Sequence, residues 1–213
     1  MPRVLLLACV LLASLRPAAA ETLVCLGDSL TAGYGVDADE AWPALLQQGL
    51  DEKLPGRWKV VNAGVSGDTT AGGLARVPWL LKSHPDVVLI CLGGNDGLRG
   101  LDPAASEANL DAMVTRFQAA HARVVLAGMQ LPTNYGADYR ARFAGIYPRV
   151  AERHHVALMP FLLVGVGGDA ALNQADGVHP NPQGHRLVAR AVQDFLAPLL
   201  APAAAAPAQG AGR

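Results

Sequence analysis

The stretch Val24-Cys25-Leu26-Gly27-Asp28-Ser29-Leu30-Thr31 determines how the rest of the chain is arranged. An apolar run ends there in a glycine, an aspartate and a serine, and an amphipathic helical pattern soon follows. Apolar runs of this length that are bounded by turn residues are typical of strands. We therefore predict a strand over 22–26, followed by a loop that presents the hydroxyl of Ser29 at the carboxyl end of the strand.

Further strands and helices alternate along the chain. Strands are predicted at 58–62, 87–92, 123–128 and 156–159, and helices at 40–53, 69–82, 103–120, 138–154 and 182–199. Pro78 falls inside the second helix and should kink or shorten it. The run 87–92 has no polar alternation, as in a central parallel strand. This pattern predicts an α/β fold, a three-layer α/β/α domain with a flavodoxin-like parallel five-stranded sheet in the order 2-1-3-4-5.

The predicted strand order places two candidate residues side by side. Strands one and three are neighbours whose crossovers leave on opposite faces, and the crevice at their carboxyl ends is where such folds bind ligands. Ser29 follows strand one, and Asn95 in Gly93-Gly94-Asn95-Asp96 follows strand three. The fold and the residues thus point independently to the same place.

A serine hydroxyl is a weak nucleophile and needs a base. His179 is the best candidate, because Asp176 lies three residues before it and one turn can bring the carboxylate to the far ring nitrogen. An acyl-transfer site also needs donors for the oxyanion. Gly64 permits close approach of a backbone N–H, and Asn95 and Ser29 can add others. Taken singly, these residues also fit ordinary turns and surface positions.

Taken together, the motifs resemble a known superfamily. Gly27-Asp28-Ser29-Leu30, Gly64, Gly93-Gly94-Asn95-Asp96 and Asp176-Gly177-Val178-His179-Pro180 are similar, in order and spacing, to the four sequence blocks of the SGNH (GDSL) hydrolases. Ala41-Trp42-Pro43-Ala44-Leu45-Leu46 and Leu131-Pro132-Thr133-Asn134-Tyr135-Gly136 further resemble the bacterial periplasmic multifunctional thioesterase/protease/lysophospholipase (arylesterase) family. The resemblance extends over essentially 21–200.

The resemblance implies a role for each matching residue. Ser29 is expected to be the nucleophile and a backbone oxyanion donor, with Gly64 and Asn95 as the other donors. His179 is the expected base and Asp176 its orienting partner. Asp28 is expected to support the Ser29 loop, although a simple cap is the alternative. The family's mobile loop corresponds to 130–139 and should close over the acyl chain. The chain departs most from the family in the glycine-rich segment 161–174, a candidate lining of the acyl pocket, so no chain-length preference is carried over.

The expected activity is hydrolysis of carboxylic esters and thioesters, including aryl esters, acyl thioesters and lysophospholipids, through an acyl-enzyme on Ser29. Three alternatives are a carbohydrate-ester deacetylase of the same superfamily, a metal-dependent phosphoesterase and a lipid-binding protein that has lost catalysis. The phosphoesterase would need clustered metal ligands. The remaining histidines lack spaced acidic or cysteine partners and are interpreted as surface or helix-end residues: His84, His121, His154, His155 and His185. We predict no metal site and no cofactor.

Residues 1–20 have the pattern of a Sec-type signal peptide. Arg3 precedes an apolar core over 4–15, and Ala18-Ala19-Ala20 offers a cleavage site. A membrane anchor is the alternative, but the apolar run is about half of the ~20 residues that a spanning helix needs. We therefore expect a periplasmic or secreted protein without stable membrane insertion after cleavage. The hydrolase domain is assigned to 21–200, and the alanine- and proline-rich 201–213 to a disordered tail.

Composition limits the possible partners. A formal net charge of −1 gives no indication of nucleic-acid binding. The expected partner is a small-molecule acyl ester or thioester, lipids included, and the chain length predicts a monomer. Cys25 and Cys91 both lie in apolar strand patterns four residues before a candidate site residue. A disulfide would suit an exported protein, but we favour free buried thiols, because a bridge between adjacent parallel strands would be unusual.

Overall fold

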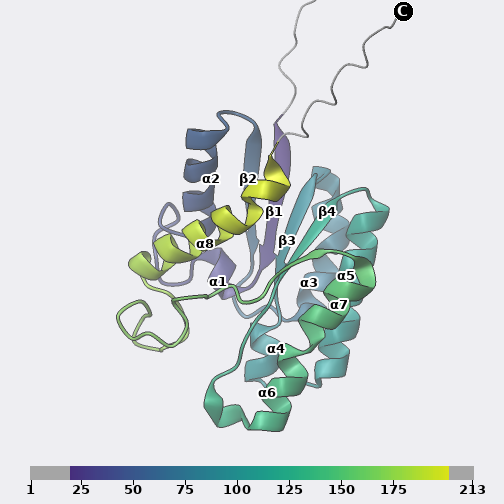
Figure 1. Ribbon diagram of the computed structural model, residues 1–213, viewed down its shortest axis with the longest axis vertical. Helices are drawn as coiled ribbons and strands as arrows, with labels where there is room; N and C mark the ends of the chain where they lie inside the picture. Colours follow the sequence, from purple (N-terminus) through teal and green to yellow (C-terminus); the bar gives the residue numbers. More distant parts are fainter. Residues whose placement is uncertain (1–19, 202–213) are drawn as a thin grey trace, which may run out of the picture.

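The centre of the molecule is a parallel sheet of five strands (Figure 1). The computed structural model describes residues 20–201. The strands are β1 (Glu21–Gly27), β2 (Trp58–Gly64), β3 (Val87–Cys91), β4 (Arg123–Ala127) and β5 (Ala157–Met159). They pair in the order β2-β1-β3-β4-β5, which confirms the predicted topology.

The register of the central strands brings their carboxyl ends to one edge. Gly27, the last residue of β1, pairs with Gly64 of β2 and with Cys91 of β3. All five residues of β3 are buried, as the unbroken apolar run predicted. The loops that follow β1, β2 and β3 therefore begin side by side, and this alignment positions the candidate site.

Helices cover both faces of the sheet. They are α1 (Ser29–Ala32), α2 (Trp42–Lys53), α3 (Thr70–Leu80), α4 (Gly94–Leu98), α5 (Pro103–Ala119), α6 (Ala137–Ala144), α7 (Ile146–His154) and α8 (Pro182–Leu200), with 3₁₀ turns η1 (Leu81–Ser83) and η2 (Thr133–Tyr135). Helix α2 packs against α8 on one face, whereas α5 packs against α3 and α7 on the other (Figure 1). This arrangement is the predicted three-layer α/β/α architecture.

Local sequence signals explain most helix boundaries. The Asp102 side chain accepts the Ala104 N–H at the start of α5, and the Asn181 side chain caps α8 in the same way. Pro78 lies inside α3, which ends at Leu80 and tightens into η1. Proline has no N–H for the ladder and crowds the preceding turn, so the expected shortening is confirmed.

The structure contains two short helices that were not predicted, and it divides one predicted helix in two. The segment after β1 was expected to be a loop, but α1 begins at Ser29 itself, and the turn at 93–96 is the start of α4. Helices of four or five residues are too short to show amphipathic periodicity. The single helix predicted at 138–154 is two, α6 and α7, which meet at Gly145. Pro148 lacks the N–H that would continue the ladder across this junction.

The two cysteines of the sheet are free and buried, which confirms the preferred interpretation. Burial raises the pKa of both thiols, so they remain neutral. Within 20–201, no helix has the length and apolar character needed to cross a membrane. The predicted signal peptide, except for Ala20, and the predicted tail, except for residue 201, lie outside the described residues.

His185 contradicts its assignment to the surface or a helix end. Its side chain is 1% exposed in α8, and Nδ1 lies 3.2 Å from the backbone nitrogen of Trp42, whose N–H it accepts. This bond satisfies the first turn of α2, for which the N-cap residue Ala41 offers no side chain acceptor. By contrast, His84 and His155 occupy left-handed positions at helix ends, as expected.

The burial of His185 predicts a pH-dependent stability. Burial, aided by the charge of His179, lowers the pKa of His185 to about 4, from 6.5 when unperturbed. The unfolded state therefore takes up the proton first, and the free energy of unfolding should fall by up to about 3 kcal/mol as the pH drops from about 6.5 to about 4. Above pH 6.5 this contribution is fully present. A His185→Gln variant should lose this part of the slope in urea unfolding at a series of pH values; identical slopes would contradict the assignment.

Candidate active site

Ser29 is fixed where β1 turns directly into α1. Asp28 caps this helix, because its Oδ1 accepts the Leu30 N–H at 3.0 Å. The backbone N–H of Tyr34 closes the helix on the Ser29 carbonyl oxygen at 3.1 Å. Gly27 permits the sharp turn, since a Cβ there would lie 2.0 Å from Thr31 Oγ1. The hydroxyl of Ser29 is thus held by a strand end and a helix start, which is more rigid than a free loop.

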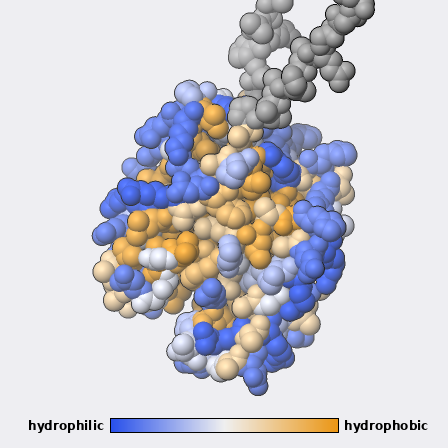
Figure 2. All heavy atoms as spheres, viewed as in Figure 1, coloured by the Kyte–Doolittle hydropathy of each residue, from blue (hydrophilic) through white to orange (hydrophobic). Residues whose placement is uncertain are grey.

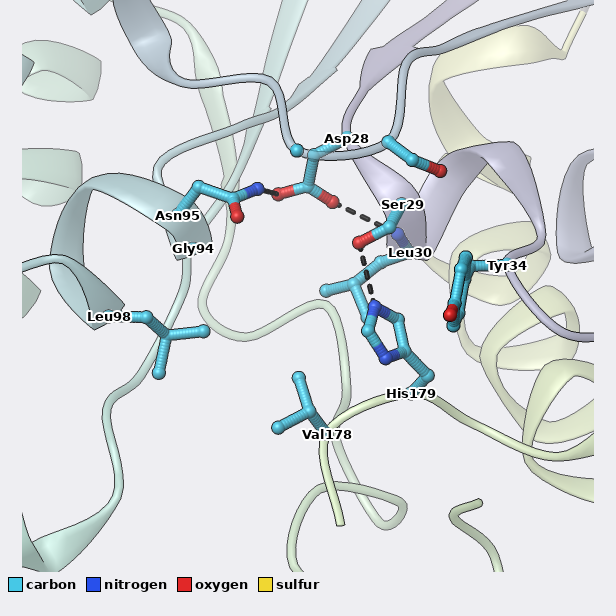
Figure 3. Close-up of a pocket in the computed structure, with 11 residues that line it drawn as sticks. Asp28, Ser29, Leu30, Tyr34, Gly94, Asn95, Leu98, Val178 and His179 are labelled. Carbon is cyan, nitrogen blue, oxygen red and sulfur yellow. Dashed lines mark hydrogen bonds between the residues drawn. The ribbon is translucent and has the colours of Figure 1, made fainter. Parts of the chain in front are cut away.

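His179 reaches Ser29 from the loop before α8 (Figure 3), and Asp176 lies three residues earlier on the same loop. His179 Nε2 lies 2.8 Å from Ser29 Oγ, and His179 Nδ1 lies 2.7 Å from Asp176 Oδ2. The three side chains form a continuous hydrogen-bonded chain between residues that are 150 positions apart in the sequence. The Tyr34 ring lies beside the imidazole with centroids 4.7 Å apart. This arrangement can take a proton from the hydroxyl and hold the resulting imidazolium.

The acidic groups of the site have opposite environments. The backbone N–H groups of His179 and Val178, together with the His179 ring, lower the pKa of Asp176 to about 2. Asp176 is therefore a carboxylate at neutral pH. Burial raises the pKa of Asp28 to about 6, although the Leu30 N–H and the charge of His179 oppose this effect. Hydrogen bonds from the Leu30 N–H and from the Asn95 amide join Asp28 to the internal polar network.

Two of the three predicted oxyanion donors, Asn95 and Gly64, already have acceptors. Asn95 Nδ2 donates to the Asp68 carbonyl oxygen at 2.9 Å and to Asp28 Oδ2 at 3.3 Å (Figure 3). The Gly64 N–H donates to Asn62 Oδ1 at 3.0 Å. Asn95 borders the pocket of Ser29 and His179, whereas Gly64 lies behind α1 and is absent from the lining. To face an oxyanion, Asn95 has to exchange one of these bonds.

Asp96, the second residue of the Asn95-Asp96 pair, has a structural role in the interior. It is 2% exposed, and its carboxylate accepts the Thr70 N–H and hydroxyl and the Ser106 hydroxyl. These bonds tie α4 to the start of α3 and to α5. Asp96 therefore holds Asn95 in place from inside the protein, a role that sequence spacing could not reveal.

Two adjoining cavities lie at this end of the sheet. The first, of about 230 Å³, contains Ser29, Asn95 and His179. The second, of about 320 Å³, is lined mainly by apolar residues and shares Leu30, Gly94, Leu98 and Val178 with the first. Its other walls come from 129–132 and from Phe161, Leu163, Gly167 and Gly168. Figure 2 shows a hollow on this face, with apolar side chains gathered beside it.

The structure thus assembles most of the residues that the sequence singled out. Ser29, Asp28, Asn95, His179 and Asp176 meet at one end of the sheet. Sequence reasoning missed Tyr34, for which the adjacency to the Ser29 helix was the available signal, and the buried role of His185. Among residues 20–201, no group of three or more His, Cys, Asp or Glu side chains is arranged to hold a metal ion.

Comparison with known proteins agrees with this geometry. The model of the GDSL-like Lipase/Acylhydrolase family matches residues 25–187. The chain is 48% identical to esterase TesA of Pseudomonas aeruginosa, covering 87% of this chain and 92% of that protein. It is 45% identical to thioesterase 1/protease 1/lysophospholipase L1 of Escherichia coli K12, covering 89% of each. A crystal structure of TesA superposes with a TM-score of 0.81 at 46% identity, over 84% of this chain and 99% of that one. The chain therefore belongs to the GDSL-like lipase/acylhydrolase family, within the SGNH hydrolases.

Proposed function

We propose that this protein is a serine hydrolase of carboxylic esters and thioesters that works through an acyl-enzyme on Ser29. The observation that carries the proposal is the 2.8 Å approach of His179 Nε2 to Ser29 Oγ, with Asp176 on the opposite ring nitrogen. Ser29 attacks the acyl carbonyl while His179 takes its proton, and the ionised Asp176 stabilises the imidazolium. His179 then protonates the leaving alcohol or thiol, and water releases the acid by the same route.

The developing oxyanion is stabilised by the backbone N–H of Ser29 and by the Asn95 amide. Gly64, expected to be a further donor, binds Asn62 Oδ1 through its N–H and is absent from the cavity lining, whereas Gly67 in the loop after β2 borders the cavity. Of the two bonds that the Asn95 amide makes, the one to Asp28 is the longer at 3.3 Å. Turning that N–H toward the substrate costs a weak bond and gains one to a developing negative charge. Asp28 thereby has two roles: it caps α1, and it accepts a hydrogen bond from Asn95 when no substrate is bound.

The acyl chain occupies the second cavity. This cavity shares four lining residues with the cavity of Ser29. Parts of 130–139, the loop expected to close over the acyl chain, and of 161–174, the candidate lining of the acyl pocket, contribute to its other walls. Its volume of about 320 Å³ lies within the range of ligand pockets, which begins at about 300 Å³. The substrates are therefore acyl esters and thioesters with an extended apolar chain, aryl esters and lysophospholipids among them. The loop 130–139 closes over the bound chain.

The cellular setting follows from the first residues of the chain. The positive start, apolar core and alanine triplet within 1–20 support export by a Sec-type signal peptide, with residues 21–200 as the catalytic domain. We propose a periplasmic or secreted monomer.

Filling the acyl cavity tests the proposed substrate class. Gln130 is exposed and borders only the second cavity, so a Gln130→Trp variant narrows its mouth without disturbing the core. We expect kcat/KM for long-chain p-nitrophenyl esters to fall about tenfold or more, since lost pocket contacts cost about 1–3 kcal/mol. Turnover of the acetate ester should change little. The measurement is a panel of esters and thioesters of increasing chain length.

Gln130→Ala serves as the matched control and should retain the wild-type profile. Equal losses on acetate and long-chain esters would place the acyl chain elsewhere. Wild-type activity confined to acetate esters would favour the deacetylase alternative, and binding of lipids without turnover would favour the non-catalytic one.

A further inference from the structure

Gln174 joins the loop of the base to the helix of the nucleophile. Its Nε2 donates to the Tyr34 carbonyl oxygen at 2.7 Å and to the Pro180 carbonyl oxygen at 3.0 Å. Pro180 directly follows His179, and Tyr34 closes α1 on the Ser29 carbonyl. A single amide group therefore spans the two segments that carry the reacting side chains.

The orientation of the Gln174 amide is unambiguous. Both of its neighbours are carbonyl oxygens, which only accept, so the NH₂ end has to face them. The amide also lies close against Gly35, where a Cβ would lie 2.1 Å from Gln174 Oε1. Two donated hydrogen bonds and a close backbone contact thus fix one side chain conformation.

The loop that Gln174 holds has few other restraints toward Ser29. Residues 174–180 contain no helix or strand; the Gln174 N–H donates to the His179 carbonyl oxygen, and Asn173 and Pro180 form an isolated bridge. In the described chain, two side-chain hydrogen bonds connect this loop to residues 29–36: the one between His179 and Ser29, and the one from Gln174 to Tyr34. Beside the packing of the Tyr34 ring on the imidazole, the Gln174 bridge is therefore the contact that fixes the distance between base and nucleophile.

We infer that Gln174 is a positioning residue that holds His179 Nε2 at its working distance from Ser29 Oγ. This inference rests on the proposed function, because it assigns Gln174 a part in the same proton transfer. Gln174 is not in the lining of either cavity, so it acts through His179 and not on the substrate. Small displacements of reacting groups are costly: about 1 Å can reduce the rate about 100-fold.

A Gln174→Met variant tests the bridge. Methionine keeps the length and the packing on Gly35 but donates no hydrogen bond. We expect kcat for p-nitrophenyl esters to fall by about tenfold to 100-fold, with KM within about twofold of wild type. The rate at which a fluorophosphonate labels Ser29 should fall in parallel. This rate reports the activation of Ser29 and does not depend on binding of an acyl chain in the second cavity. Gln174→Glu offers a second variant, which has no donor when ionised.

Gln193→Met is the matched control. Gln193 Nε2 likewise donates to a distant carbonyl oxygen, that of Gly49 at 2.8 Å, and its amide packs on that glycine. This bridge joins α8 to α2 and touches no residue of the site, so its loss should affect thermal stability and leave kcat unchanged. If Gln174→Met and Gln174→Glu behave like Gln193→Met, or raise KM at constant kcat, the inference is wrong. This result is distinguishable from a failure of the proposed function. If the proposed function is wrong, the wild-type protein itself will neither hydrolyse esters nor be labelled on Ser29.

Discussion

Replacing Ser29 or His179 by alanine is expected to reduce kcat for p-nitrophenyl esters by about 10⁴-fold or more while leaving the fold intact. In the proposed mechanism Ser29 supplies the atom that attacks the acyl carbon, and His179, 2.8 Å away, is the base within reach of its proton. Neither side chain contributes to the apolar core of the domain. The loss should therefore come from chemistry and not from unfolding.

The double variant distinguishes this mechanism from separate contributions. If Ser29 and His179 act as one unit, removing the second after the first should cost almost nothing more. Losses that multiply would mean that the residues act independently. A fluorophosphonate should add its mass to the Ser29 peptide of the wild type, slowly or not at all to His179→Ala, and never to Ser29→Ala. Circular dichroism of each variant controls for folding, and undiminished turnover by Ser29→Ala would refute the assignment of the nucleophile.

The sheet order and the meeting of Ser29, Asn95 and His179 could be predicted because they depend on patterns that a sequence displays. Apolar runs separated by helical stripes restrict the topology, and parallel strands bring their carboxyl ends together. The short helices α1 and α4 were not predicted, because one turn of helix is too short to show a repeating pattern of apolar residues. Their existence follows instead from capping by Asp28 and from the buried bonds of Asp96.

The polar contacts in the interior could not be predicted from the spacing of residues in the sequence. His185 reads as a surface residue, yet the packing of α8 on α2 places it where the Trp42 N–H needs an acceptor. Asn95 and Gly64 were chosen as candidate oxyanion donors by residue type, but the groups that accept their N–H bonds here, on Asp68, Asp28 and Asn62, could not be predicted. Such hydrogen-bond partners are determined by the packing of elements that are far apart in the chain, so local sequence patterns do not predict them.

Gly64→Ala is expected to lower both stability and activity, because it displaces the helix that carries Ser29. A Cβ at position 64 would lie 2.2 Å from the backbone nitrogen of Ala32 and 2.7 Å from the carbonyl carbon of Thr31. Both are main-chain atoms of α1, so no side chain can rotate away to make room. Overpacking of this kind typically costs about 1–3 kcal/mol, and displacement of Ser29 by about 1 Å would lower kcat about 100-fold.

Gly56→Ala controls for the general cost of replacing a glycine. Gly56 has a φ of +67° and no atom within 4 Å of a built Cβ, so its replacement should cost roughly 1 kcal/mol of backbone strain and leave kcat unchanged. Wild-type kcat in folded Gly64→Ala, measured beside urea unfolding, would contradict the prediction. Alanine retains the backbone N–H of Gly64, which donates to Asn62 Oδ1. A loss of kcat in Gly64→Ala would therefore report the displacement of Ser29 and not the removal of a backbone donor at the end of β2.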